Sequence, residues 1–215
     1  LRGLLALEVP APSLLFSPAY YLYRSSSTLW QSTLRVLWWT PLFKSRCRRC
    51  DEGLYLYGGL PYFAGPVDLS VGKNCRISGR TTITGRSAAP VKPRLRIGDN
   101  VDLGWQSTLA IGTRIELGDN VRIAGQCFLA GYPGHPLDAQ RRAAGCADDD
   151  GQARDIVLEQ DVWLGTGVTV LAGVRIGRGT VVSAGSLVCR DLPAGVIAGG
   201  NPARVIRSLD AEPTL

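Results

Sequence analysis

The chain has 215 residues, 45% of them hydrophobic, and a formal net charge of +6 at pH 7. This length and composition allow a sizeable core, which excludes a disordered chain. The positive charge favours an anionic partner, either a phosphorylated cofactor, a membrane surface or a nucleic acid, and does not choose among the three.

The first 65 residues predict an amphipathic helical or irregular extension. Ser17 and Pro18 form a helix start signal, and Pro41 is a stop signal. Apolar residues recur between them at helical spacing, and a basic run follows: Leu22, Leu29, Trp30, Leu34, Leu37 and Trp38, then Lys44, Arg46, Arg48 and Arg49. We expect this helix either to pack against the rest of the protein or a partner subunit, or to lie on the inner surface of a membrane with its basic flank toward anionic lipid.

Two features of the opening bear on location. No apolar run approaches the ~20 residues of a membrane span. Residues 1–16 lack both a charged leader and a small-residue cleavage site, so we expect no cleavable signal peptide.

Six cysteines, at positions 47, 50, 75, 127, 146 and 189, are scattered through a chain too long to need disulfide bonds. Reduced thiols in the cytoplasm are therefore expected. Cys47 and Cys50 form a CRRC pair, but a zinc ribbon needs a second matched pair and redox folds place such a pair after a strand in an α/β pattern. Neither context is visible, so we expect no metal and no redox function here.

From about residue 66 to residue 200 the sequence repeats with a period of six. An aliphatic residue, usually followed by a small one, recurs at Val71, Ile77, Ile83, Ile97, Leu103, Leu109, Leu117, Ile123, Leu129, Leu164, Val170, Ile176, Val182 and Val188. That spacing fits neither a helix nor a hairpin meander and is the hexapeptide β-helix repeat. The sequence thus predicts an all-β parallel solenoid over residues 66–209, with a tail at 210–215.

Three hexapeptides make one triangular coil whose aliphatic residues share an interior, and roughly six coils fit in this span. Cys75 and Cys127 fall at or next to inward positions, which favours their being small core residues. The repeat is interrupted at residues 85–96, by two extra residues between Leu109 and Leu117, and at about residues 130–155. Insertions in a solenoid become surface loops, where binding groups are usually carried.

The segment DVWLGTGVTVLAGVRIGRGTVVSAGSLVCRDLPAGVIAGGNPARVIRSL resembles the last coils of the hexapeptide acyltransferases, and HPLDAQRR resembles a loop of their galactoside and maltose O-acetyltransferase branch. The resemblance covers about residues 66–209. It implies a left-handed parallel β-helix, a homotrimer with active sites between subunits, and transfer of an acetyl group from acetyl-CoA to a hydroxyl, generally of a sugar. The left-handed winding comes from the resemblance alone, because parallel crossovers are generally right-handed.

His135 is the only histidine of the chain and matches the general base of that family. An alcohol attacks a thioester poorly unless its proton is removed as the new bond forms, and a neutral imidazole suits that task. The tetrahedral oxyanion needs a fixed donor, and the resemblance implies the backbone N–H of Thr166. Asp138, Arg141 and Arg142 either shape the loop as a charged turn or act directly.

The resemblance also implies the residues that contact coenzyme A. They are Thr166, Ala184, Cys189, Arg190, Arg204 and Arg207. Cys189 departs from the usual threonine of this branch, which puts a hydrogen bond there in doubt. Arg204 and Arg207 either bind phosphate or only cap the end of the solenoid.

The residues expected to bind the acceptor depart further from this branch. Its members hold sugar hydroxyls with an Asn and an Asp, and the corresponding segment here, LGWQSTLAIGTRIELG, lacks both. Trp105 and Gln106 are the candidate replacements, Trp105 stacking on a sugar face and Gln106 hydrogen-bonding a hydroxyl, although Trp105 can equally pack between subunits. We therefore expect an acetyl-CoA:carbohydrate O-acetyltransferase that modifies a sugar unit of an exported polysaccharide or lipopolysaccharide. An N-acyltransferase acting on an amino sugar or amine and a non-catalytic scaffold are the alternatives. No nucleic-acid binding is expected, since the arginines lack a recognition motif and an interleaved aromatic platform.

Overall fold

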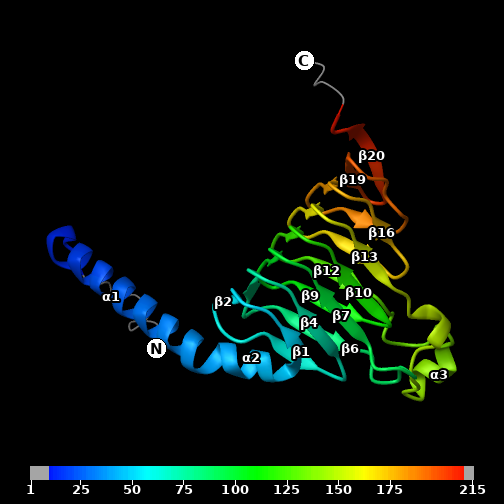
Figure 1. Ribbon diagram of the computed structural model, residues 1–215, viewed down its shortest axis with the longest axis horizontal. Helices are drawn as coiled ribbons and strands as arrows, with labels where there is room; N and C mark the ends of the chain where they lie inside the picture. Colours follow the sequence, from blue (N-terminus) through cyan, green and yellow to red (C-terminus); the bar gives the residue numbers. More distant parts are fainter. Residues whose placement is uncertain (1–9, 211–215) are drawn as a thin grey trace.

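Strands recur along the chain in groups of three, and each strand pairs in parallel with the strand of the preceding group. The computed structural model describes residues 10–210. Its strands form three sheets, here called A, B and C, that are the three walls of one column (Figure 1). Six such groups, or coils, run from β1–β3 to β16–β18, so the predicted parallel hexapeptide solenoid is confirmed.

The walls differ in length. Sheet A contains β1 (Cys47–Cys50), β4 (Asp68–Val71), β7 (Arg94–Ile97), β10 (Arg114–Leu117), β13 (Ile156–Leu158) and β16 (Arg175–Ile176). Sheet B contains β2 (Tyr55–Tyr57), β5 (Arg76–Ser78), β8 (Asp102–Leu103), β11 (Arg122–Ile123), β14 (Trp163–Leu164), β17 (Val181–Val182), β19 (Val196–Gly200) and β20 (Ala203–Ser208). Sheet C contains β3 (Tyr62–Ala64), β6 (Thr82–Gly85), β9 (Thr108–Ile111), β12 (Phe128–Ala130), β15 (Thr169–Leu171) and β18 (Leu187–Val188).

The interior of the column is formed by the residues that the period of six identifies. All fourteen aliphatic positions, from Val71 to Val188, are buried, and the most exposed of them, Ile97, shows 4% of its surface. Cys75 and Cys127 are also buried, as expected. Because one aliphatic residue from each wall fills each coil, the same spacing sets both the core and the positions of the three edges.

The edge between sheets A and B shows how the chain turns. The turn residues Asn74, Asn100, Asn120 and Asp161 have φ between +55° and +63°, a left-handed conformation that Asn and Asp tolerate better than other non-glycine residues. The side chains also connect the coils, since Asn100 Nδ2 donates to Asn120 Oδ1 and Asn120 Nδ2 donates to Asp161 Oδ1, each at 2.8 Å. The turns at this edge are therefore short, and side-chain hydrogen bonds join them from coil to coil.

The coils begin earlier than the sequence predicts. Strands β1–β3 pair in parallel with β4–β6, with one irregularity between Cys47 and Arg49, so the solenoid starts at Cys47 and not near residue 66. The far end is closed by β19 and β20, an antiparallel pair added to sheet B. The predicted tail lies outside the described residues apart from Asp210, as do residues 1–9 of the opening.

The helical extension is longer than its signals predict. It comprises α1 (Ser13–Leu34), a π-helical turn (Arg35–Trp39) and α2 (Thr40–Arg46). Pro18 lies inside α1, and Pro41 is the second residue of α2, so the predicted start and stop are both wrong. In the π turn the Thr40 N–H donates to the Arg35 carbonyl, one residue further back than in an α-helix. Pro41 therefore lies in the first turn of α2, where its missing N–H is tolerated.

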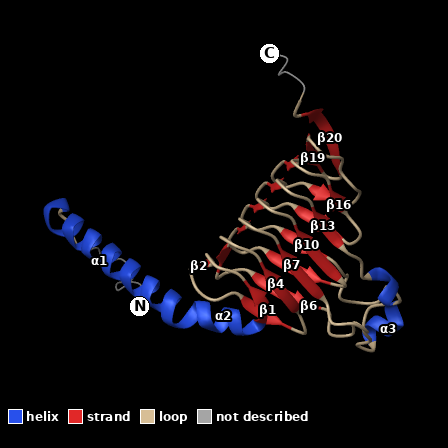
Figure 2. Ribbon diagram, viewed as in Figure 1, coloured by secondary structure: helices blue, strands red, loops and turns tan. Residues whose placement is uncertain are grey.

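This extension projects from the wide end of the column, which it contacts through α2, the π turn and the last turns of α1, and the Arg35 guanidinium lies 4.1 Å from the centre of the Tyr55 ring (Figures 1 and 2). Phe43 in α2 is fully buried, whereas α1 has no buried residue, and Trp30 and Trp38 are 63% and 61% exposed. Most of the predicted apolar stripe in α1 therefore does not pack against the same chain, although Leu34 at its end is partly buried. Among the described residues, no helix combines the length and apolarity required to cross a bilayer.

Candidate functional site

The edge between sheets C and A carries both long insertions of the solenoid. Residues 86–93 connect β6 to β7, and residues 131–155 connect β12 to β13. The second insertion, here called the histidine loop, contains α3 (Ala139–Ala143) and a 3-10 turn (Asp150–Gln152). The two insertions lie side by side at one corner of the column (Figure 1).

His135 lies on the exposed surface of the histidine loop. It directly follows Gly134, whose φ of +82° belongs to the left-handed region that favours glycine. Within residues 10–210 its imidazole makes no hydrogen bond. Both ring nitrogens are therefore available to another molecule.

The charged residues after His135 make contacts within the loop. Asp138 caps α3, with its Oδ1 accepting from the Arg141 N–H at 2.8 Å. Arg142 Nη1 donates to the carbonyls of Pro136 and Leu137, each at 2.9 Å. These contacts favour the shaping role that the sequence left open for Asp138 and Arg142.

Arg86, which the sequence did not single out, joins the two insertions. Its Nε donates to both carboxylate oxygens of Asp148, at 3.1 and 3.0 Å, and its Nη1 donates to Asp150 Oδ1 at 2.6 Å. The Arg86 and Asp148 side chains are only 3% and 5% exposed. Burial lowers the pKa of Arg86, but hydrogen bonds to Asp150 and Asp148 outweigh it and raise that pKa above its ordinary value.

A second set of predicted residues lies along the edge between sheets B and C. Trp105 and Gln106 follow β8, Thr166 follows β14 and Ala184 follows β17, and all four are exposed. Gly185 donates its N–H to the Thr166 carbonyl at 2.8 Å, and a Cβ on Gly165 would lie only 2.6 Å from the Ala184 nitrogen. Glycine is needed at that position for the two coils to approach each other.

The acceptor candidates on this edge are fixed by their neighbours one coil away. A Cβ on Gly125 would lie 2.6 Å from Trp105 Nε1, so the indole rests against the backbone of that glycine while half of its surface stays exposed. Gln106 Oε1 accepts from Gln126 Nε2 at 3.3 Å. Both side chains thus lie flat along the B–C edge.

The remaining predicted residues lie near the narrow end of the column. Cys189 and Arg190 are exposed directly after β18, at the C–A edge. Arg204 and Arg207 are exposed on β20, and each donates Nη1 to a neighbouring backbone carbonyl, at 2.9 and 3.0 Å. They belong to the strand that closes the solenoid, and both guanidinium groups retain further donors.

The two proposed catalytic groups do not meet within one chain. His135 is carried by the C–A edge, whereas Thr166 is at the B–C edge, on the other side of sheet C. Apart from Arg204 and Arg207 on β20, the structure therefore separates the predicted site residues into two groups. His135, Cys189 and Arg190 share one edge, and Trp105, Gln106, Thr166 and Ala184 share another.

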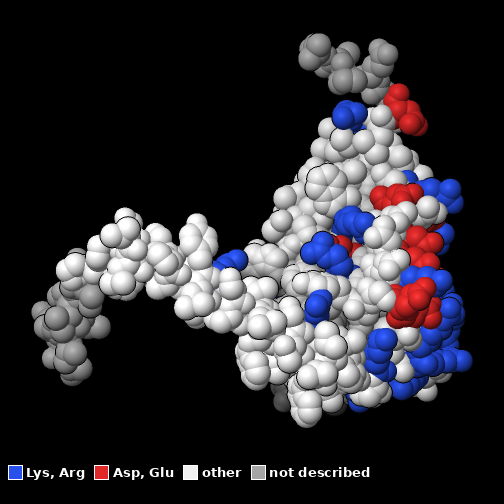
Figure 3. Space-filling model, turned by 60° about the vertical axis from the view of Figure 1, so that its left-hand side comes forward, with Lys and Arg blue, Asp and Glu red and all other residues white. Residues whose placement is uncertain are grey.

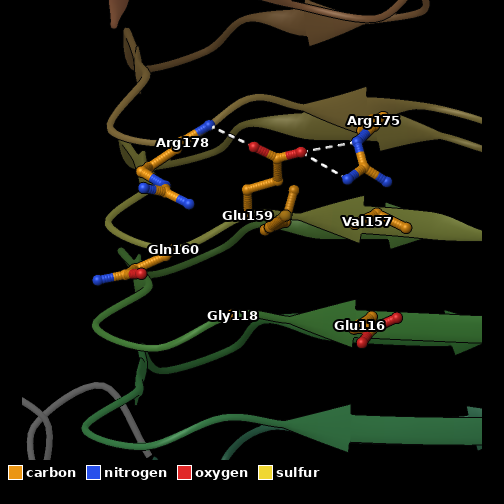
Figure 4. A pocket seen from close by; sticks show the side chains of 8 residues that line it. Glu116, Gly118, Val157, Glu159, Gln160, Arg175 and Arg178 are labelled. Carbon is orange, nitrogen blue, oxygen red and sulfur yellow. Dashed lines mark hydrogen bonds and ion pairs between the residues drawn. The ribbon is translucent and has the colours of Figure 1, made fainter. Parts of the chain in front are cut away.

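Two further clusters of ionisable side chains lie on or beside sheet A. Glu159 accepts from the Arg178 N–H at 2.9 Å and from Arg175 Nε at 2.7 Å, beside a hollow of about 340 Å³ on sheet A (Figure 4). These contacts hold the pKa of Glu159 below its ordinary value.

Cys47 and Cys50 are half-buried free thiols. A hydrogen bond from Cys47, opposed by burial, lowers the pKa of Cys50 to about 7, and the same interaction raises that of Cys47. Within residues 10–210, no group of three or more His, Cys, Asp or Glu side chains is arranged to hold a metal ion.

Comparison with known proteins matches two family models to the coils. Residues 94–129 match the hexapeptide repeat of succinyl-transferase, and residues 155–190 match the bacterial transferase hexapeptide. A galactoside O-acetyltransferase of Lactococcus lactis is 42% identical over 76 residues, which are 35% of each chain. A 2,3,4,5-tetrahydropyridine-2,6-dicarboxylate N-acetyltransferase of Clostridium perfringens is 48% identical over 56 residues, 26% of this chain and 24% of that protein. The chain thus spans only about a quarter to a third of the length of these relatives.

Solved structures share the fold over a larger part of the chain. AntD, an N-acyltransferase from Bacillus cereus solved with dTDP-4-amino-4,6-dideoxyglucose and coenzyme A, superposes with a TM-score of 0.64 at 20% identity and covers 80% of this chain and 89% of its own. A hexapeptide-repeat-containing acetyltransferase from Vibrio cholerae gives a TM-score of 0.51 at 25% identity, covering 80% of both chains. The solenoid is common to all three proteins.

Proposed function

We propose that this chain, whose coils match the hexapeptide models of bacterial transferases, is an acetyl-CoA-dependent O-acetyltransferase acting on a sugar hydroxyl. The family matches confirm the resemblance seen in the sequence. The single observation that carries the activity is the position of His135, the only histidine, exposed on an insertion at an edge of the column. The left-handed winding of the coils is part of the same proposal.

His135 acts as the general base. Its imidazole takes the proton of the acceptor hydroxyl as the oxygen attacks the thioester carbon of acetyl-CoA. The carbonyl oxygen gains negative charge, and the backbone N–H of Thr166 donates to it. Support for this role comes from the ladder of backbone hydrogen bonds, in which the Thr166 N–H has no acceptor within residues 10–210. Collapse of the tetrahedral intermediate breaks the C–S bond and leaves the acetyl ester, and the departing thiolate of coenzyme A takes the proton from the His135 imidazolium.

The complete site forms between two copies of the chain. Because His135 and Thr166 lie at different edges, the C–A edge of one copy must face the B–C edge of the next. Such a head-to-tail contact joins unlike surfaces and closes into a ring when the rotation allows it. We propose a homotrimer with one site at each of its three interfaces.

Coenzyme A lies toward the narrow end, between the B–C edge of one copy and the C–A edge of the next, which carries Arg190. Thr166 and Ala184 offer backbone groups to the pantetheine arm, and Arg190, Arg204 and Arg207 offer cations to the phosphates. The exposure of all three arginines supports this role. Cys189 stays a candidate contact only through its backbone.

The acceptor sugar lies beside Trp105 and Gln106. These residues are two coils from Thr166 along the same edge, which corresponds to about 10 Å at the usual strand spacing. A half-exposed indole that lies flat along the edge can stack on a sugar ring, and the Gln106 amide can hydrogen-bond a hydroxyl. The acceptor we favour is a sugar unit of an exported polysaccharide or lipopolysaccharide.

The helical extension supports a location at the inner face of the cytoplasmic membrane. Residues 10–50 contain no Asp or Glu, and the exposed aromatic and aliphatic side chains of α1 are flanked by basic residues. Figure 3 shows this extension as an almost uncharged arm, with the charged side chains gathered on the column. An apolar helix with tryptophans and a basic flank suits the interface of an anionic bilayer. Six free cysteines, with Cys146 and Cys189 exposed, support a reducing compartment.

One experiment tests the activity and separates the rivals. The protein is incubated with acetyl-CoA and a panel of hydroxyl sugars, amino sugars and glycan fragments, and both free thiol and product mass are measured. Acetyl esters on a carbohydrate support the proposal. Acetylation of amines alone would identify an N-acyltransferase, and absence of both products and of coenzyme A binding would leave a scaffold.

A further inference from the structure

We propose that Arg86 is a positioning residue that fixes the histidine loop against the solenoid and so places His135 for proton transfer. This inference rests on the proposed function of His135. Arg86 does not face the acceptor, because its guanidinium is buried and directed at the loop itself.

The histidine loop has little apolar anchorage of its own. Between residues 132 and 152 only Pro136 and Asp148 are buried, and Leu137, two residues after the histidine, is 77% exposed. A loop of this length without a packed core is held mainly by its polar contacts. Asp148, a buried carboxylate, is the point at which such a contact is made.

Arg86 connects that point to the rigid coils. Its backbone N–H donates to the Ile111 carbonyl at 2.9 Å, which continues the ladder between β6 and β9. Its Nη2 donates to the Asp148 carbonyl at 2.6 Å, in addition to the bonds from Nε to the carboxylate and from Nη1 to Asp150. The backbone of Arg86 therefore belongs to sheet C, and its side chain belongs to the histidine loop.

Further hydrogen bonds connect the segment at Asp148 to the histidine. Asp149, the next residue, accepts from Arg141 Nη1 at 2.6 Å. Arg141 stands beside Arg142 in α3, and Arg142 holds the Pro136 carbonyl directly after His135. These contacts form one continuous path of hydrogen bonds and short chain segments from the coils to the general base.

The geometry of a general base decides its efficiency. It must lie within hydrogen-bond reach of the hydroxyl whose proton it takes, and a displacement of about 1 Å can cost about 100-fold in rate. Loss of the Arg86 contact leaves Asp148 as a buried carboxylate without its counter-ion, so the loop is expected to leave the coils. The B–C edge, where coenzyme A is proposed to bind, lies outside this path.

The test compares Arg86→Met, Asp148→Leu and the double variant with the wild-type enzyme. Each single variant should lower kcat about 100-fold while KM for acetyl-CoA is unchanged. The double variant should be no worse than the poorer single one, because both changes remove the same contact. Arg86→Lys, which keeps a charge beside Asp148, should recover part of kcat. If Arg86→Met does not fold, the double variant and Arg86→Lys carry the comparison.

Hydrogen exchange supplies a readout that needs no activity. Amides of residues 132–152 should exchange faster in Arg86→Met, with the amides of the three sheets unchanged. The matched control is Arg175→Met on sheet A, which removes a pair with Glu159 at 2.6 Å that is 59% exposed on the arginine side (Figure 4). That control should change neither kcat nor exchange.

The outcomes separate the two proposals. Faster exchange in the loop together with a fall in kcat supports the positioning role. Unchanged exchange, or unchanged kcat with a loosened loop, would overturn it. A wild-type protein that transfers no acetyl group to any acceptor would overturn the proposed function, and this is known before the variants are compared.

Discussion

The rings of Phe43 and Phe63 meet with their centroids 5.6 Å apart, joining the base of the helical extension to the first coil of the solenoid. Phe43 is fully buried. Phe43→Ala should lower the free energy of unfolding by about 3–5 kcal/mol, because it removes a large buried side chain and leaves a cavity. Denaturant unfolding followed by circular dichroism measures the change. Phe16→Ala, on the exposed part of α1, is the control and should change the free energy of unfolding by less than about 0.5 kcal/mol. Equal effects of the two substitutions would contradict the role of Phe43 as the anchor of the extension.

His135→Ala should lower kcat about 10²–10⁴-fold, since the hydroxyl loses the base that takes its proton. Oligomeric state and coenzyme A binding should be retained, because the change removes only one exposed imidazole. Gln140→Ala, an exposed change in the same loop, is the control and should keep wild-type turnover. Near wild-type kcat in His135→Ala would remove His135 from the mechanism.

Assembly of the site from two copies predicts complementation. His135→Ala should be inactive, and Ala184→Trp should be inactive because the indole fills the coenzyme A side of the B–C edge. Trimers reassembled from equal amounts of the two should recover about a quarter of wild-type activity, since half of the C–A edges and half of the facing B–C edges are intact. A site contained within one chain would give no recovery.

Cys50 should react with iodoacetamide with a midpoint near pH 7. Its pKa is lowered to about 7 by the hydrogen bond from Cys47, so the thiolate that reacts forms as the pH rises from 6 to 8. In Cys47→Ala the midpoint should move up toward the ordinary thiol value of about 8.5. Labelling rates measured by mass spectrometry across this range check the shift, and an unchanged midpoint in Cys47→Ala would rule out the pair as its cause.

Binding to lipid should require the exposed tryptophans of the extension. The wild-type protein should float with phosphatidylcholine vesicles that contain phosphatidylglycerol, and less so as salt is added, because charge attraction is screened. Trp30→Glu combined with Trp38→Glu should abolish flotation, whereas Leu137→Glu, an equally exposed change on the histidine loop, should not. Flotation that survives the double change would place the contact elsewhere.

The interior of the solenoid was predictable because one rule, an aliphatic residue every six positions, sets both burial and register. The rule missed the first coil for a physical reason. Its residues Cys50, Leu56 and Phe63 pair with Val71, Ile77 and Ile83, but they are spaced by six and then seven residues and only Leu56 is aliphatic. Pairing with a regular neighbour is enough to hold an irregular coil.

The candidate site was predictable only in part. His135 could be singled out because the chain has no other histidine, and Thr166 and Ala184 because they stand in the best-matched repeats. The pair of Arg86 and Asp148 could not, since 62 positions separate them and no local pattern relates their types. The division of the residues between two edges likewise depends on which turn each one occupies, which only the folded coils reveal.

The stacking of the coils has a consequence for the choice of acceptor. The extension joins the column at its first coil, and the histidine loop leaves from the fourth, three steps or about 14 Å further along. With the helix lying on a bilayer, His135 would stand at a set height above the lipid headgroups. The coils between the helix and the loop, together with the Arg86 contact that holds the loop beside β6, would then decide which sugar unit of a lipid-anchored glycan, counted from its anchor, comes within reach of the base.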